Sequence, residues 1–153
     1  MKIKKLISSL SLEEKVSLLS GFDNWHTQGI KKHKIPKIKM SDGPNGVRGD
    51  SSSPQTSACF PSPILLGATW NEKLIKKIGS ATGEEALFKD VDVLLAPTIN
   101  LHRHPLGGRH FECYSEDPVL TSKIACAYVS GVQSKGVAAC LKHFAGNDTE
   151  YER

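Results

Sequence analysis

The sequence lacks the cysteine patterns of secreted and metal-binding domains. It has only 4 cysteines in 153 residues, none forms a C-x-x-C pair, and no Cys/His cluster has the spacing of a structural zinc site. Free thiols are typical of a reducing compartment. Cys126 and Cys140 lie in apolar surroundings, so we expect them to behave as small buried hydrophobic residues.

Long apolar runs are absent as well. No run approaches the ~20 residues that a membrane-spanning helix needs. The apolar residues behind the N-terminal lysines are interrupted by Ser8, Ser9 and Ser11, which is not the pattern of a signal peptide. We therefore expect a soluble, cytoplasmic protein that has no membrane partner.

The chain also lacks a strong excess of either charge. It has 20 Lys+Arg against 16 Asp+Glu, a formal net charge of +4, and much of the excess lies in lysines near the N-terminus. Few aromatic residues interleave with these lysines, so we interpret them as a solvated surface and expect no nucleic-acid partner. The content of 39% hydrophobic and 24% charged residues is ordinary for a soluble globular domain.

Helix signals are present in three places. Ser11-Leu12-Glu13-Glu14 has the pattern of a capping box, and the apolar residues that follow predict a helix that ends at Gly21. A second helix is predicted over 71–89, although Gly79 and Gly83 weaken the expectation that it is continuous. Asp117-Pro118 predicts the start of a third helix, which runs to about Lys135.

Short apolar runs predict three β-strands, over 38–40, 91–95 and 137–141. Strands that alternate with helices indicate right-handed βαβ units and a parallel sheet. A full eight-stranded barrel takes ~250 residues. The predicted fold class is therefore α/β, the N-terminal part of a (β/α)8 TIM-like barrel that is incomplete and contains about three β/α units.

Charged and hydrogen-bonding side chains follow these runs. Asp42 and Arg48 come after the first run, Arg109 lies in the long loop after the second, and Lys142 and His143 follow the third. The carboxyl ends of strands are where such sheets build active sites. An ionised Asp can accept from two hydroxyls at once, and nearby cations keep it ionised. This set suits a polyhydroxylated ligand, provided that the last strand ends or bulges at Lys142, because neighbouring strand residues point to opposite faces.

Each feature also has a plainer interpretation. The segment 42–46 could be only a turn, Arg109 a surface residue of a mobile loop, and Lys142-His143 a polar pair at a strand end. His102-Arg103-His104 resembles the H-x-H motif of barrel metallohydrolases, but further ligands are not visible in the sequence. We therefore expect no metal site.

In order along the chain, these motifs resemble glycoside hydrolase family 3, and within it the β-glucosidases. The resemblance covers nearly the whole sequence and is carried by the segments 11–16, 40–48, 96–103, 107–118 and 142–144, followed by Asn147 and Glu150. It implies that residues 1–153 are the N-terminal portion of the N-terminal barrel domain of that family.

The resemblance also implies roles for individual residues. Asp42 is similar to the carboxylate that accepts from two hydroxyls at the far edge of the sugar in the −1 subsite. The other sugar-contacting positions implied are Arg48, Arg109, Lys142, His143 and Arg153. The family nucleophile is an Asp in a later Ser-Asp-Trp-type motif and its acid/base is a Glu further on, so no catalytic residue is expected within this chain. Asp148 and Glu150 correspond to ordinary loop residues.

The implied function is a hydrolase of O-glycosyl bonds, with retaining, β-glucosidase-type cleavage of terminal β-D-glycosyl residues. The substrate would be a β-glucoside or oligosaccharide, no cofactor is implied, and the resemblance leaves the oligomeric state open. This chain would supply the −1 sugar-binding half-site and would be inactive alone. Two alternatives stay open: a non-catalytic sugar-binding remnant of a truncated gene, and a metal-dependent barrel hydrolase.

Overall fold

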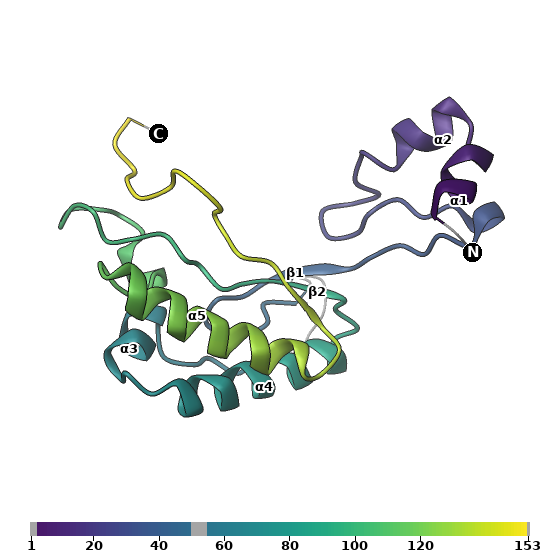
Figure 1. Cartoon of the computed structure of the whole chain (residues 1–153). Helices are drawn as coiled ribbons and strands as arrows, with labels where there is room; N and C mark the ends of the chain where they lie inside the picture. The colour runs from purple at the N-terminus through teal and green to yellow at the C-terminus, as the bar shows by residue number, and fades with distance from the viewer. Residues whose placement is uncertain (1–2, 50–54, 153) are drawn as a thin grey trace. The chain divides into compact units, whose positions relative to one another are not determined.

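The computed structural model describes residues 3–49 and 55–152 (Figure 1). The chain divides into two compact units, Met1–Met40 and Ser41–Arg153. No helix in the described part of the chain is long and apolar enough to cross a membrane.

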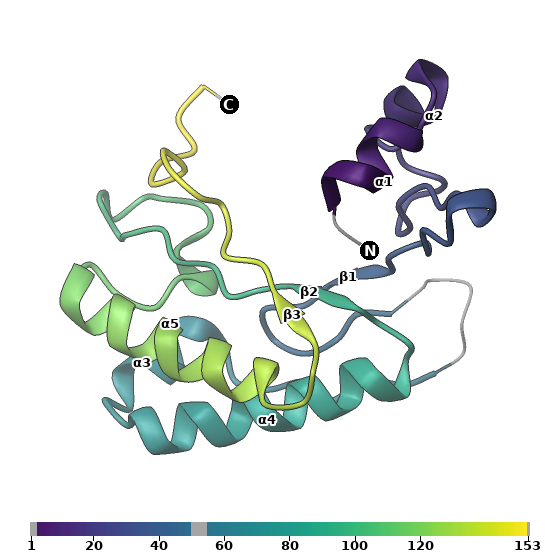
Figure 2. The same ribbon diagram turned by 45° about the vertical axis from the view of Figure 1, so that its right-hand side comes forward.

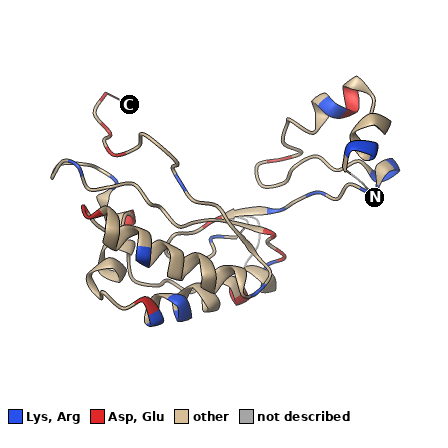
Figure 3. Ribbon diagram, viewed as in Figure 1, with Lys and Arg blue, Asp and Glu red and all other residues tan. Residues whose placement is uncertain are grey.

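The first unit contains α1 (Ile3–Ser9), α2 (Leu12–Ser17) and the short 3₁₀ helix η1 (Lys31–His33). The capping box of α2 is confirmed: the Glu14 amide donates to the Ser11 hydroxyl at 3.1 Å, and the Ser11 amide donates to the Glu14 carboxylate at 2.9 Å. The hydrogen bond from the Ser11 amide lowers the pKa of Glu14. Lys and Arg mark both helices and the segment that leads into the first strand (Figure 3).

The predicted end of this helix at Gly21 is wrong, because α2 stops at Ser17 and Leu18 is its C-cap. The hydroxyls of Ser17 and Ser20 donate to the carbonyls of Glu14 and Ser17, at 2.8 and 2.9 Å. Serine side chains that bond to backbone groups in this way compete with helix hydrogen bonds. Gly21 instead forms an isolated antiparallel bridge with Thr27.

The sheet consists of β1 (Met40–Asp42), β2 (Val93–Leu95) and β3 (Ala138–Ala139), in the order β1-β2-β3. β2 and β3 are parallel, with Val93 opposite Ala138 and Leu94 opposite Ala139. The alternation of helices and strands and the α/β class are confirmed. The first strand begins at Met40 and not at Ile38, and the other two are shorter than their apolar runs, because only these residues pair in the ladder. Among the described residues, the Ala96–Pro97 and Lys142–His143 peptide bonds are cis.

The helices of the second unit, in the part of the chain that the structure describes, are α3 (Pro63–Ala68), α4 (Glu72–Phe88), η2 (His110–Glu112) and α5 (Pro118–Gln133). α4 and α5 lie side by side on one side of the sheet (Figures 1 and 2). Both begin as the sequence predicts. Asn71 caps α4 by accepting from the Leu74 amide at 3.0 Å, and Asp117 caps α5 by accepting from the Val119 amide at 2.8 Å.

Glycines allow the backbones of α4 and α5 to approach closely. α4 is continuous through Gly79 and Gly83, contrary to the weakening expected from helix propensity. A Cβ on Gly79 would lie 2.3 Å from the Tyr128 carbonyl oxygen, and one on Gly131 would lie 2.3 Å from the Lys76 carbonyl oxygen. These residues are small because any side chain would meet the neighbouring helix backbone.

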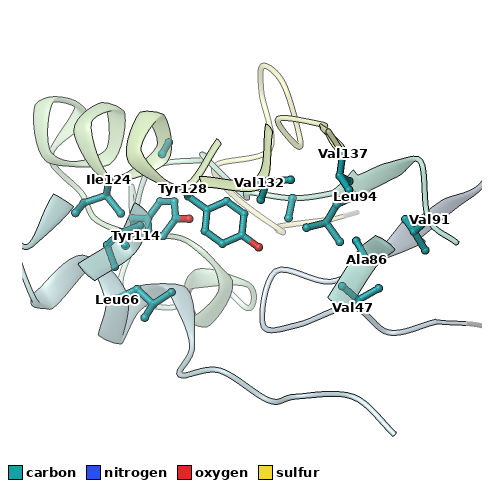
Figure 4. Close-up of a cluster of buried hydrophobic side chains, with 13 residues drawn as sticks. Val47, Leu66, Ala86, Val91, Leu94, Tyr114, Ile124, Tyr128, Val132 and Val137 are labelled. Atoms are coloured by element: carbon teal, nitrogen blue, oxygen red, sulfur yellow. The ribbon is translucent and has the colours of Figure 1, made fainter. Parts of the chain in front are cut away.

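The hydrophobic core fills the space between these helices and the sheet (Figure 4). Its largest fully buried side chains include Tyr128, Leu66, Ile75, Leu94 and Ile124. Burial raises the pKa of Tyr128 to about 12. The expectation that Cys126 and Cys140 are buried is wrong: Cys126 is exposed and Cys140 is half-buried, whereas Cys113 is buried. Cys126 lies on α5 and lines a hollow.

Candidate functional site

The strands deliver polar residues to one edge of the sheet. Asp42 is the last residue of β1, Thr98 follows β2, and Lys142 follows β3. An isolated parallel bridge between Thr98 and Lys142 extends the pairing of β2 and β3 beyond their ends. Because carboxyl ends of parallel strands meet at the same edge, these side chains come together although they are far apart in the sequence.

Asp42 and Lys142 form an ion pair in which the Lys142 ammonium donates to Asp42 Oδ1. Lys142 is largely buried, with 14% of its side chain exposed, whereas Asp42 is 36% exposed. The pair is therefore fixed from the protein side and open to solvent on the carboxylate side. A carboxylate with this exposure can accept further hydrogen bonds from a ligand.

Arg109 is held by a buried carboxylate. Its Nε donates to Glu112 Oε1, and its Nη2 lies 3.3 Å from His143 Nε2. Glu112 is 6% exposed and also accepts from the Thr98 hydroxyl at 3.3 Å. The hydrogen bond to Glu112 raises the pKa of the Arg109 guanidinium, so this side chain is a permanent cation with a fixed direction.

Asn100 fixes the backbone of His143. The His143 amide donates to Asn100 Oδ1 at 2.8 Å, and the Asn100 amide group donates to the His143 carbonyl at 3.3 Å. β3 ends at Ala139, so Lys142 and His143 lie outside a regular strand, as a shared site requires. Lys142 then reaches Asp42 while His143 reaches Arg109.

The structure thus joins four of the predicted site residues, Asp42, Lys142, His143 and Arg109, into one continuous group. Arg48 is exposed, and its backbone amide donates to the Asp42 carbonyl at 2.8 Å. Arg153 lies outside the described residues.

The sequence reasoning missed Glu112, Asn100 and Thr98 as site residues. A signal was present, since Arg109 and Glu112 are three residues apart and Asn100 closely follows an apolar run. What the sequence does not reveal is that these side chains are buried and directed at Arg109 and His143.

The carboxylates near the end of the chain bind loop groups. Asp148 accepts from the Leu101 amide at 2.9 Å and lies 3.9 Å from Arg103 Nε. Glu150 accepts from the Asn147 side chain at 2.9 Å. Asp148 thus joins its loop to the segment at Leu101, and Glu150 contacts a residue of its own loop; that both are ordinary loop residues stays a prediction.

His102 has a structural role. Its Nε2 lies 3.0 Å from the His110 carbonyl oxygen and 3.1 Å from the Cys113 carbonyl oxygen, and its ring stacks on that of His110. Within residues 3–49 and 55–152, no group of three or more His, Cys, Asp or Glu side chains could hold a metal ion. The H-x-H interpretation therefore gains no support from the structure.

Two hollows differ in their relation to this group. The larger, of about 820 Å³, is lined mainly by α5 together with Ile99, Leu101 and Leu141, and it includes none of the predicted site residues. The smaller, of about 620 Å³, opens between the loops 104–108 and 149–151. Neither hollow is lined by Asp42, Arg109, Lys142 or His143; the first includes Leu141, which precedes Lys142, and the second includes Gly108, which precedes Arg109.

Comparison with known proteins gives a consistent result. Residues 4–152 match the glycosyl hydrolase family 3 N terminal domain. A beta-glucosidase from Rhizobium radiobacter is 55% identical over 153 residues, which cover 99% of this chain and 19% of that protein. The thermostable beta-glucosidase B from Acetivibrio thermocellus is 45% identical, over 99% of this chain and 21% of that protein.

Solved structures show the same likeness. Beta-glucosidase 3B from Thermotoga neapolitana, in complex with glucose, superposes with a TM-score of 0.91 at 40% identity, covering 100% of this chain and 24% of that one. The beta-glucosidase from Kluyveromyces marxianus, also in complex with glucose, gives a TM-score of 0.93 at 42% identity, covering 98% and 18%. This chain spans about a fifth of the length of the curated relatives it matches. The predicted fold class, an incomplete N-terminal part of a (β/α) barrel, is confirmed.

Proposed function

Because this chain belongs to glycoside hydrolase family 3, we propose that it supplies the −1 sugar-binding half-site of a retaining β-glucosidase. The substrates would be β-glucosides or oligosaccharides with a terminal β-D-glycosyl residue. In this proposal residues 1–153 are the N-terminal portion of the N-terminal barrel domain of the family. The observation that carries it is the Asp42–Lys142 ion pair, joined through His143 to Arg109 at the carboxyl ends of the strands.

The chemistry of the group suits a sugar. A carboxylate accepts hydrogen bonds from neighbouring hydroxyls, and Lys and Arg donate to the same oxygens. The Lys142 ammonium donates to Asp42 Oδ1 and so holds the carboxylate in place for this role. Glucose is bound in the Thermotoga and Kluyveromyces beta-glucosidase structures, which supports the same ligand class here. Arg48, His143 and Arg153 belong to the proposed set of sugar-contacting residues.

In the proposed reaction, sugar binding and bond cleavage are carried out by different parts of the protein. In a retaining glycosidase a carboxylate attacks the anomeric carbon, a carboxylic acid protonates the leaving oxygen, and water then hydrolyses the glycosyl-enzyme. We assign both reacting groups to parts of the protein other than residues 1–153. The contribution of this chain is binding energy remote from the reacting bond, which orients the ring for attack. The free cysteines support a cytoplasmic location for such an enzyme.

The test is hydrolysis of an aryl β-glucoside by the protein made from the full reading frame, compared with the variants Asp42→Asn and Asp90→Asn. Two lost hydrogen bonds to a charged group correspond to about a hundredfold or greater fall in kcat/KM. Asp90 is an exposed residue with a φ of 54°, a conformation that Asn tolerates, so its variant is the matched control. Normal kcat/KM in Asp42→Asn would contradict the assigned role.

A second measurement separates the enzyme from a non-catalytic sugar-binding protein. The 153-residue chain alone is expected to release no aryl alcohol from the same substrate. If the full-reading-frame protein also released none but still bound glucose, as seen by glucose-dependent shifts of the Lys142 and His143 resonances, the sugar-binding alternative would replace the enzyme.

A further inference from the structure

We propose that Glu85 and Lys89, an ion pair at the C-terminal end of α4 in which the lysine is buried, are positioning residues for Asp42. They act through the loop that follows Asp42, and the inference rests on the proposed function of that carboxylate in sugar binding.

Lys89 is buried to an unusual degree for a lysine, with 2% of its side chain exposed. Its ammonium donates to the Val47 carbonyl at 2.9 Å and to the Ser57 hydroxyl, and it lies 3.3 Å from Glu85 Oε1. The Ser57 hydroxyl also donates to the Val47 carbonyl at 2.6 Å. The Lys89 ammonium therefore binds two positions of the segment that follows Asp42, Val47 and Ser57.

Glu85 binds the same two sides through their amides. Its Oε1 accepts from the Ala58 amide at 2.9 Å, and its Oε2 lies 3.5 Å from the Val47 amide. Val47 is therefore held by both its amide and its carbonyl, and its side chain is fully buried in the core. Glu85 and Lys89, at the C-terminal end of α4, thus fix the backbone at Val47.

The backbone between Asp42 and Val47 forms a tight, hydrogen-bonded turn. The Gly46 amide donates to the Gly43 carbonyl at 3.3 Å, and a Cβ on Gly43 would lie only 1.9 Å from the Gly46 carbonyl oxygen. The Arg48 amide, next to Val47, donates to the Asp42 carbonyl at 2.8 Å. A shift of Val47 is thus transmitted through one peptide to the backbone of Asp42.

Stability alone is a poor reason for this pair. Burying two charges costs desolvation energy, and well-packed apolar residues of similar volume often serve stability equally well. The polar pair does what apolar residues cannot, since it fixes backbone amides and carbonyls of an irregular loop in direction as well as in distance.

The experiment is a double-mutant cycle in the full-reading-frame protein, with the aryl β-glucoside as substrate. Glu85→Gln/Lys89→Met removes both charges, so that none is left buried alone. The control is Glu84→Gln/Lys135→Met, because Lys135 and Glu84 form a pair of the same chemistry at 2.5 Å with 31% and 63% of their side chains exposed. We expect the buried-pair variant to lower kcat/KM at least tenfold and the control to change it less than twofold.

In the Asp42→Asn background, the buried-pair variant is expected to lower kcat/KM by less than a further twofold, because its effect passes through Asp42. The same tenfold loss in both backgrounds would show an independent structural effect and overturn the proposal. If the double variant does not fold, Ser57→Ala removes one contact of Lys89 and takes its place, with an expected loss of twofold to fivefold that again disappears with Asp42→Asn.

Amide hydrogen exchange in the same proteins separates this inference from the proposed function. The amides of Val47, Arg48 and Ala58 are expected to exchange at least tenfold faster in Glu85→Gln/Lys89→Met than in the parent, and this measurement requires no sugar. If exchange accelerates but the parent hydrolyses no β-glucoside, the proposed function fails while the positioning role stands. Unchanged exchange would overturn the positioning role whatever the activity.

Discussion

The two units of the chain differ in the contacts that stabilise each of them internally. Of the buried hydrophobic side chains in the described residues, only Leu10 belongs to the first unit, and all the others lie in the second. In the first unit, Leu12, Val16 and Leu19 are 71%, 58% and 89% exposed. Its order comes from polar contacts, such as the capping box and the His33–Glu14 pair at 3.1 Å.

Because of this difference, a substitution is expected to affect stability differently in the two units. A polar contact between residues close in sequence contributes little beyond its own segment, because solvent can replace most of it. A buried contact in the second unit joins segments far apart in sequence, so its loss leaves a cavity, a clash or an unpaired charge. The second unit is therefore expected to respond more strongly to single substitutions than the first.

The largest stability effect is expected for Glu112→Gln in the second unit. Removing one partner of a buried ion pair typically costs 3–5 kcal/mol, but Arg109 is 31% exposed, so we expect about 2–3 kcal/mol of lost unfolding free energy. Urea denaturation followed by circular dichroism measures it. Glu116→Gln, an exposed position on the same loop, should change the free energy of unfolding by less than about 0.5 kcal/mol. An equal loss of unfolding free energy in Glu112→Gln and Glu116→Gln would show that the buried ion pair contributes no more to stability than an exposed carboxylate.

The next effect is expected for Gly79→Ala at the crossing of α4 and α5. Alanine is favoured over glycine in a helix by about 1 kcal/mol, yet the new Cβ would lie 2.3 Å from the Tyr128 carbonyl oxygen. Overpacking of this kind costs about 1–3 kcal/mol, and the clash is with backbone, so we expect a net loss of about 2 kcal/mol in the same denaturation experiment. Gly108→Ala, where a Cβ meets nothing within 4 Å, should be nearly neutral. A stabilised Gly79→Ala would show that the helices are free to move apart.

The parts of the fold that depend on local signals were predictable from the sequence. The caps Ser11, Asn71 and Asp117 mark the starts of α2, α4 and α5, because capping uses residues within one turn. The strand bounds were less predictable. The apolar run 137–141 indicates a strand, but only Ala138–Ala139 form one, since pairing depends on a partner strand remote in the sequence. α1 and α3 were missed although Pro63 follows Ser62 in a helix-start pattern.

The candidate site divides in the same way. Asp42, Lys142, His143 and Arg109 follow apolar runs and could be singled out from the sequence. Glu112 and Lys89 were not singled out, because a charged residue is normally taken to be solvated and their contacts with Thr98 and Ser57 join segments far apart in the sequence. The supporting contacts of a charged site are thus less visible in a sequence than the residues they support.

In the first unit, Ser11→Ala is expected to cost about 1 kcal/mol, the usual effect of losing an N-cap side chain. The lost contact is the 3.1 Å hydrogen bond from the Glu14 amide to the Ser11 hydroxyl. Because few apolar side chains depend on α2, the measurement is local: exchange of the Glu14 amide should accelerate several-fold, while amides of α4 and α5 keep their protection. Ser8→Ala, an exposed serine of α1 that caps nothing, is the control. Loss of protection in α4 would show that the units unfold together.

The smallest effect at neutral pH concerns the thiols, which compare buried and exposed positions without any mutation. Burial, with a smaller contribution from the charge of Glu112, raises the pKa of Cys113 from 9.0 to about 11, whereas Cys59 and Cys126 are exposed. Only the thiolate reacts with iodoacetamide, so at pH 8 we expect Cys59 and Cys126 to be modified and Cys113 to remain free until the chain is unfolded in guanidinium. Mass spectrometry of the digested protein identifies each site.

Because the raised pKa means that the unfolded chain loses this proton first, Cys113 should lower stability as the pH rises from about 9 to about 11 and have no effect on it below pH 8. Rapid modification of Cys113 at pH 8 in the folded protein would show that the structure around Glu112 opens readily, and would remove the contrast between buried and exposed thiols within the second unit.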